Sequence, residues 1–149
     1  MGTRSRVGVM HGTVCKSVYC HYDGYLNYTG EILNKHYDSA TANELVARGD
    51  NSGVQVTVNA MNFYGERGET NVSWQVAHNF EEFLEQVDNC GCEYYYIMRD
   101  GVWYAGCVYG VKGLVVNGLV PLAEALAADT IEQLTAEETE TQIAKVLFK

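Results

Sequence analysis

The sequence predicts an α+β fold, with a mainly antiparallel sheet built from hairpins and helices packed on one face. Two observations support this prediction. First, two strand–turn–strand patterns, within residues 5–22 and 93–108, have turns too short for crossovers, so their strands must pair antiparallel. Second, the amphipathic helical segments stand in groups rather than alternating regularly with single strands, as a parallel α/β sheet would require.

The first hairpin is expected at the start of the chain. Residues 5–10 alternate weakly in polarity, residues 11–13 signal a turn, and residues 14–22 are rich in β-branched and aromatic side chains. Because side chains alternate along a strand, Lys16 and His21 fall on opposite faces, and neither face is cleanly apolar. We expect this strand to be half exposed, with a functional reason for its polar groups.

The middle of the chain predicts short helices and strands. Thr41 with Glu44 forms a capping box and Gly49 a stop signal, while Asn79 with Glu82 marks another helix start. In order, we expect a helix over 30–36 capped by Thr29, a helix over 42–48, a strand over 54–58 that residues 61–64 either continue or follow, a charged turn over 65–69, a strand over 72–77, and a helix from Asn79.

The second hairpin has the clearest signal. Residues 93–99 and 102–108 flank Asp100-Gly101, the dipeptide that favours a type I′ turn. Beyond it we expect a loop or short edge strand over 109–118, a helix over 122–128 begun by Pro121, and a last helix over 135–148. The domain prediction is a single α+β domain over residues 1–128 and an acidic helical tail over residues 129–149.

Charge and hydropathy limit the classes of partner. The net charge of −9 gives no general attraction to a phosphate backbone, so we expect no nucleic-acid binding. No apolar run approaches the roughly 20 residues that cross a bilayer, and the N-terminus has no apolar signal region. We therefore expect a cytoplasmic protein without a membrane partner.

The five cysteines, an odd number at irregular spacing, predict reduced thiols rather than a disulfide framework. Cys90-Gly91-Cys92 could join His21 or His78 around zinc. However, paired zinc-binding cysteines are usually two to four residues apart, and no second pair is present. Two thiols flanking a turn glycine is the favoured interpretation, so we expect no metal and no cofactor.

No catalytic signature stands out, and a non-enzyme is favoured. Cys20 adjoins His21, but neighbouring strand residues point to opposite faces and cannot easily form a nucleophile–base pair. A nucleophile–base pair of Cys107 with a distant histidine remains an alternative. His21 and Asp23 could perform acid–base chemistry if the strand continues, although an Asp before Gly more commonly stabilises its own turn.

The aromatic residues are the most informative feature. Eight of the eleven tyrosines cluster around residues 19–28, 94–96 and 104, where they suit either sheet packing or flat ligands and interfaces. Arginines stand among them, and Arg67 lies in a glycine-flanked loop of the kind that closes over ligands. The predicted ligand-binding residues are Arg4, Arg6, His21, Tyr22, Asp23, Tyr25, Arg67, Arg99 and Trp103.

Two motifs carry a resemblance. Residues 2–6, GTRSR, and residues 20–25, CHYDGY, resemble a group of short, mostly uncharacterised phage and bacterial proteins that begin with GTRSR and carry a CHWDGY-like motif. The resemblance covers most of residues 2–126. Tyr22 stands where that motif has tryptophan, and the acidic tail is particular to this chain.

The resemblance implies a function but no assigned activity. It suggests a phage counter-defence protein in the host cytosol that binds and sequesters a small nucleotide-like ligand without converting it. Two alternatives remain open: an inhibitor that binds a host protein, and a small nucleotide hydrolase that uses His21, Asp23 or a cysteine. A pocket shared between protomers would be natural for so short a chain, so we also expect a homo-oligomer.

Overall fold

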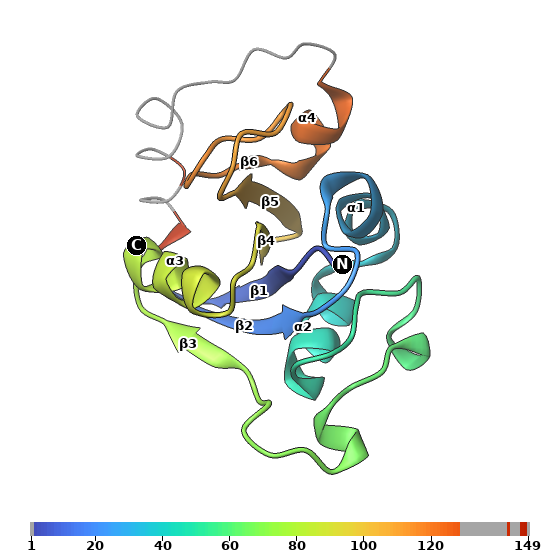
Figure 1. Ribbon diagram of the computed structural model, residues 1–149. Helices are drawn as coiled ribbons and strands as arrows, with labels where there is room; N and C mark the ends of the chain where they lie inside the picture. The colour runs from blue at the N-terminus through green and yellow to red at the C-terminus, as the bar shows by residue number, and fades with distance from the viewer. Residues whose placement is uncertain (1, 129–142, 144–146, 149) are drawn as a thin grey trace.

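A six-stranded sheet in the order β3-β2-β1-β4-β5-β6 forms the centre of the molecule (Figure 1). The structure is a computed structural model, and it describes residues 2–128, 143, 147 and 148. Every neighbouring pair of strands is antiparallel except β1 and β4. This confirms the predicted α+β class with a mainly antiparallel sheet. The strands are β1 Ser5–His11, β2 Val14–Cys20, β3 Gln75–Ala77, β4 Tyr94–Arg99, β5 Val102–Cys107 and β6 Val120–Pro121.

Both predicted hairpins are present. Strands β1 and β2 pair from Ser5 with Cys20 to His11 with Val14, and β4 and β5 pair across Asp100-Gly101. Both residues of that turn have positive φ, 51° and 80°, as a type I′ turn requires. Both hairpins are therefore present as the sequence predicted, and the Asp100-Gly101 turn accounts for the register of the second.

A parallel pairing of β1 with β4 joins the two hairpins. Ser5 lies opposite Tyr94 and Val9 opposite Met98, so both strands begin at the same end of the sheet. Because β2 runs antiparallel to β1, β2 ends there as well. Three distant segments thus meet at one end: the residues before β1, those after β2 and those before β4.

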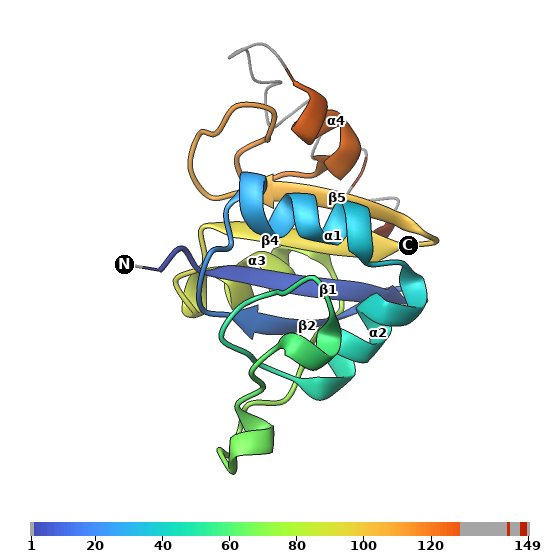
Figure 2. The same ribbon diagram turned by 90° about the vertical axis from the view of Figure 1, so that its right-hand side faces the viewer.

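The helices cover both faces of the sheet, which corrects the expectation of one covered face (Figure 2). Helices α1 and α2 pack on the face formed by Val7 and Tyr96, whereas α3 packs on the face formed by Tyr95 and Ile97. The reason lies in β4, where consecutive tyrosines point to opposite faces and both are fully buried. The helices are α1 Glu31–His36, α2 Ser39–Arg48, α3 Phe80–Asn89 and α4 Leu122–Ala127.

Helix starts agree with the sequence in one case and differ in another. The Asn79 side chain accepts a hydrogen bond from the Glu82 N–H, as predicted for α3. Helix α2 begins earlier than predicted, since Asp38 rather than Thr41 is the N-cap. Thr29 caps no helix; its hydroxyl donates to the Asp23 carbonyl at 2.7 Å.

Residues 54–64 form no strand, in contrast to the prediction. They form an irregular segment with a 3-10 turn at Val58–Ala60, and Val54 and Phe63 are buried in the α1/α2 face of the core. Of the alternating valines that predicted the strand, Val54 and Val58 are buried and Val56 is exposed, so the pattern comes from a loop that buries part of its apolar residues. The predicted strand over 72–77 shortens to β3.

The predicted helix over 135–148 and the predicted tail over 129–149 lie outside the described residues, except for residues 143, 147 and 148. Leu147 is buried in the cluster formed by α3, and the Phe148 ring lies 6.3 Å from that of Phe80. Within the described part of the chain, no helix has the length and apolarity needed to cross a bilayer.

Candidate functional site

A pocket of about 730 Å³ opens where β1 and β4 begin and β2 ends. Three segments that are distant in sequence form its walls. Four of its residues were predicted from the sequence, namely Arg4, His21, Tyr22 and Asp23. The walls are Gly2 and Arg4 before β1, His21, Tyr22 and Asp23 after β2, and Gly91 and Glu93 between α3 and β4.

The loop after β2 is fixed by main-chain hydrogen bonds. The Tyr22 N–H donates to the Ser52 carbonyl at 2.8 Å, and the Gly24 N–H donates to the Thr3 carbonyl at 2.8 Å. Between them, Asp23 adopts the left-handed region, with φ at 57°. These contacts hold the loop in one conformation, which lowers the ordering cost of binding a ligand there.

His21 is oriented by its neighbours. Its Nδ1 is hydrogen-bonded to the Tyr19 hydroxyl, and its ring meets the Tyr22 ring edge to face, with centroids 4.4 Å apart. Burial raises the pKa of Tyr19 to about 12, so this hydroxyl keeps its proton and can donate it to Nδ1. A neutral His21 that accepts this bond carries its own proton on Nε2.

Arg4 supplies a positive charge on the opposite wall. Its side chain is exposed, and it forms no ion pair with the described residues. Gly91 lies beside it: a Cβ there would be 3.1 Å from Arg4 Nη1, and the φ of +67° is the feature that favours glycine at this position. The backbone of this wall is tied to β1, since the Glu93 N–H donates to the Arg4 carbonyl at 2.9 Å.

Tyr22 gives the pocket an aromatic surface. Its side chain is 49% exposed, and Gly2 lies so close that a Cβ there would be 2.5 Å from the Tyr22 ring. Asp23 and Glu93 add carboxylate groups to the same pocket. The site therefore combines one guanidinium, one accessible ring and hydrogen-bond acceptors, a set that suits a polar ligand with an anionic group and a flat ring.

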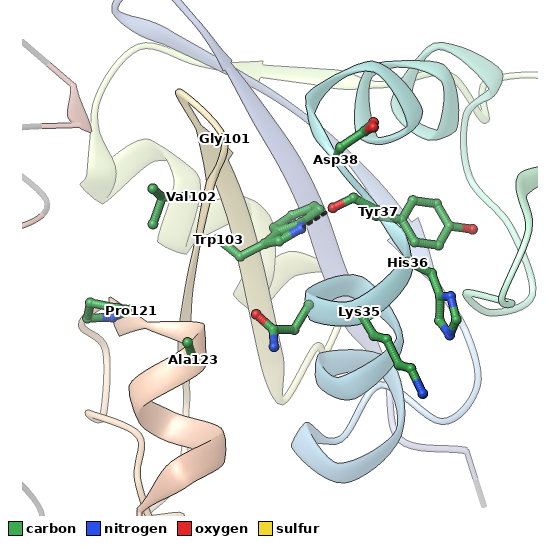
Figure 3. Close-up of a pocket in the computed structure, with 10 residues that line it drawn as sticks. Lys35, His36, Tyr37, Asp38, Gly101, Val102, Trp103, Pro121 and Ala123 are labelled. Carbon is green, nitrogen blue, oxygen red and sulfur yellow. Dashed lines mark hydrogen bonds between the residues drawn. The ribbon is translucent and has the colours of Figure 1, made fainter.

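Trp103 lies in a different pocket, of about 480 Å³, at the other end of the strands. Figure 3 shows its indole facing Tyr37, with Nε1 donating to the Tyr37 carbonyl at 2.9 Å. Only 5% of the Trp103 side chain is exposed, so its main role is to pack between β5 and α1. Arg99 also lies at that far end and pairs with Asp100.

Tyr25 and Arg67 do not line the pocket of Arg4 and Tyr22. Tyr25 is exposed beside Tyr28, with ring centroids 6.1 Å apart. Arg67 stacks over Tyr64 at 4.5 Å and forms an ion pair with Glu69. The structure thus brings four of the nine predicted residues together and disperses the others.

Arg6, the ninth predicted residue, is nearly completely buried, with 2% of its surface exposed. Its Nε and Nη2 donate to the Ser17 hydroxyl and carbonyl at 2.8 and 2.9 Å, and its Nη1 lies 3.0 Å from Cys90 Sγ. It lines a neighbouring pocket of about 550 Å³, together with Tyr19 and Asp50. The segment after α3 contributes to both pockets, since Cys90 lines this one and Gly91 and Glu93 line that of Arg4.

The comparisons give no relative. No family model, curated protein or solved structure matches this chain. In the described residues, no group of three or more His, Cys, Asp and Glu side chains is arranged to hold a metal ion. The geometry of the sites is therefore the ground for any functional proposal.

Proposed function

We propose that the chain binds and retains a small nucleotide-like anion in the pocket of Arg4 and Tyr22 and does not convert it. The observation behind this proposal is that Arg4, without an ion-pair partner among the described residues, faces the same pocket as the half-exposed Tyr22 ring. A volume of about 730 Å³ falls within the range of about 300–1,000 Å³ typical of small-molecule sites.

Each wall would have its own role. The Arg4 guanidinium would bind a phosphate through charge-assisted hydrogen bonds. The Tyr22 ring would stack on a base, and Asp23 and Glu93 would accept hydrogen bonds from ribose hydroxyl groups. Two carboxylates beside one arginine disfavour a polyanion, which agrees with the net charge of −9.

The geometry of His21 favours retention over turnover. A histidine general base is strengthened when a carboxylate orients it, whereas His21 Nδ1 is bonded to the neutral Tyr19 hydroxyl. The resemblance to short phage proteins adds that the retained ligand would be a nucleotide-type immune signal of the host. Extract from phage-infected cells is therefore the source of ligand for the experiment.

The experiment is native mass spectrometry of the purified protein before and after exposure to nucleotide-rich extract from phage-infected cells. A ligand that is retained and released intact on denaturation is expected, and the same spectra give the oligomeric state, expected to be a homo-oligomer. Two pairs of exposed-residue variants locate the site: Tyr22→Ala with Tyr109→Ala as control, and Arg4→Gln with Arg67→Gln as control.

The expected losses follow from the contacts. Loss of base stacking is worth about 1–3 kcal/mol, or roughly 5- to 150-fold in affinity. Loss of hydrogen bonds from a charged donor is worth about 1.5–3 kcal/mol, or roughly 10- to 150-fold. Both controls should retain the ligand, because Tyr109 is 65% exposed and Arg67 is paired with Glu69, neither lining the pocket.

Three outcomes would overturn the proposal. Release of a converted product would favour the hydrolase alternative. No retained mass, together with a single co-purifying host protein, would favour the inhibitor alternative. Retention that depends on Arg67 but not on Arg4 would place the site on the 65–69 loop instead.

A further inference from the structure

The second pocket contains a feature that the ligand proposal does not use: a buried cation facing a cysteine. Arg6 has two of its three guanidinium nitrogens bonded to the neutral Ser17 and the third 3.0 Å from Cys90 Sγ. Among the described residues it forms no ion pair with a carboxylate. Asp50 lines the same pocket and its carboxylate interacts electrostatically with Arg6, but it is not in ion-pair contact with the guanidinium. A Cys90 thiolate would place an anion in direct contact with this buried cation, which lowers the cost of burying its charge.

Cys90 is accessible, and a second thiol lies beside it. Cys90 is half-buried and lines the open pocket of about 550 Å³ together with Trp74. Cys92, two residues later and buried, lies within hydrogen-bonding reach of the Cys90 sulfur. Gly91 between them takes a left-handed conformation, with φ at +67°, which forms the tight turn that brings the two thiols together.

Some groups around Cys90 raise its pKa and others lower it. As a thiol, Cys90 donates to the Gln86 carbonyl at 2.9 Å, and its position at the C-terminus of α3 opposes a negative charge. Burial and the charge of Asp50 also disfavour the Cys90 thiolate. The hydrogen bond from Cys92 and the charge and hydrogen bond of Arg6 prevail and lower the pKa of Cys90 to about 6. The pKa of Cys92 is raised, first by its hydrogen bond to Cys90.

We propose that Cys90 and Cys92 form a redox-active dithiol that reduces low-molecular-weight disulfides. The Cys90 thiolate attacks one sulfur of the disulfide, whose S–S bond breaks and releases one thiolate. The Cys92 thiol passes its proton to that thiolate and attacks Cys90 Sγ, which releases the second thiolate and forms the Cys90–Cys92 disulfide. Two electrons pass from the dithiol to the disulfide, which leaves as one thiol and one thiolate.

The other three cysteines are not expected to react in this way. Burial raises the pKa of Cys15 and Cys20 to about 12 and that of Cys107 to about 11. These thiols are also fully buried, so they serve as internal standards for an unreactive cysteine. The inference does not rest on the proposed ligand, because it concerns a different pocket and needs no nucleotide.

The test uses the aromatic disulfide DTNB as the probe on the folded, fully reduced protein at pH 6. At that pH about half of a thiol with a pKa of 6 is ionised, against about 0.3% for an ordinary cysteine. The lower nucleophilicity of the more acidic thiol removes roughly tenfold of that advantage. Cys90 should therefore react about tenfold faster than a free cysteine model compound.

Variants identify the two roles. The wild-type protein should release two equivalents of chromophore in the fast phase, with a mass lower by two hydrogen atoms. Cys92→Ser should release one equivalent and keep the other half of the probe attached. Cys90→Ser should lose the fast phase. Cys107→Ser, whose hydroxyl can still donate to the Tyr109 carbonyl, should behave as wild type.

A pH profile of iodoacetamide alkylation tests the role of Arg6. The midpoint for Cys90 should lie near 6 in the wild type and rise in Arg6→Lys, which keeps the charge but loses the planar contact with the sulfur. The inference is overturned by a wild-type midpoint near the ordinary 8.5, by a fast phase that survives Cys90→Ser, or by a second equivalent released from Cys92→Ser. If Arg6→Lys does not fold, the pH profile of the wild-type protein still tests the inference.

Discussion

Tyr96→Phe removes one hydroxyl that ties the core of the sheet to the pocket loop. The buried Tyr96 hydroxyl donates to the Gly24 carbonyl at 2.8 Å, directly after Asp23 in the loop that follows β2. Without it, the carbonyl is left buried and unpaired, at a cost of about 1–3 kcal/mol. For a domain of this size, each kcal/mol lowers Tm by about 2–4 °C, so the expected fall is roughly 2–12 °C.

A matched variant separates the effect on the loop from the effect on global stability. The Tyr95 hydroxyl is equally buried and donates to the Gly118 carbonyl at 2.7 Å, far from the pocket along the chain. Tyr95→Phe should therefore cost a similar amount of stability.

The assay is calorimetry together with amide hydrogen exchange of Tyr22 and Gly24, whose N–H groups are bonded in the native loop. Tyr96→Phe should speed exchange at these two amides under conditions where Tyr95→Phe does not. Equal exchange in both variants, or a Tm change under about 1 °C for Tyr96→Phe, would refute the reasoning.

Three further predictions concern the fold. Gly106→Ala should lower Tm strongly or prevent folding, because its Cβ would lie 1.9 Å from the Gly118 carbonyl oxygen; calorimetry against wild type measures the loss. Asp38→Ala should destabilise α2 through loss of its N-cap and so lower the midpoint of urea unfolding, with Asp38→Asn as the near-neutral control. The contribution of Cys15 and Cys20 to stability should be full below pH 9 and be lost as the pH rises towards 12, because burial raises the pKa of both thiols from 9 to about 12 and the unfolded chain loses those protons first. Calorimetry between pH 9 and 12 measures the loss, and a constant Tm across this range would contradict it.

The sequence predicted best what local chemistry decides. Asp100-Gly101 specified a type I′ turn because both residues tolerate positive φ, and the hairpin formed in that register. The parallel pairing of β1 with β4 has no local sequence signal, because it depends on where two distant strands meet. The one-face expectation failed for a related reason: Tyr95 and Tyr96 show that β4 is buried on both faces, which sequence alternation alone does not reveal.

The candidate pocket was half predictable. His21 and Tyr22 stood out as polar and aromatic residues at a strand end, and the structure places both in the pocket. Gly91 and Glu93 were missed, because only the β1–β4 pairing brings their turn beside Arg4. Trp103 was included for its ring, yet aromatic clustering does not distinguish a binding surface from a core position such as this one.

The parallel pairing of β1 with β4 also affects folding during synthesis, because β4 is made long after β1. The β1–β2 hairpin needs only residues 5–20, whereas the partner of the free edge of β1 is complete only at Arg99. At about 5–20 residues per second, that edge waits roughly 4–16 s for β4, far longer than the microseconds in which a hairpin forms. An unpaired strand edge invites pairing with other chains, so slowing translation between residues 20 and 99 should raise the aggregated fraction.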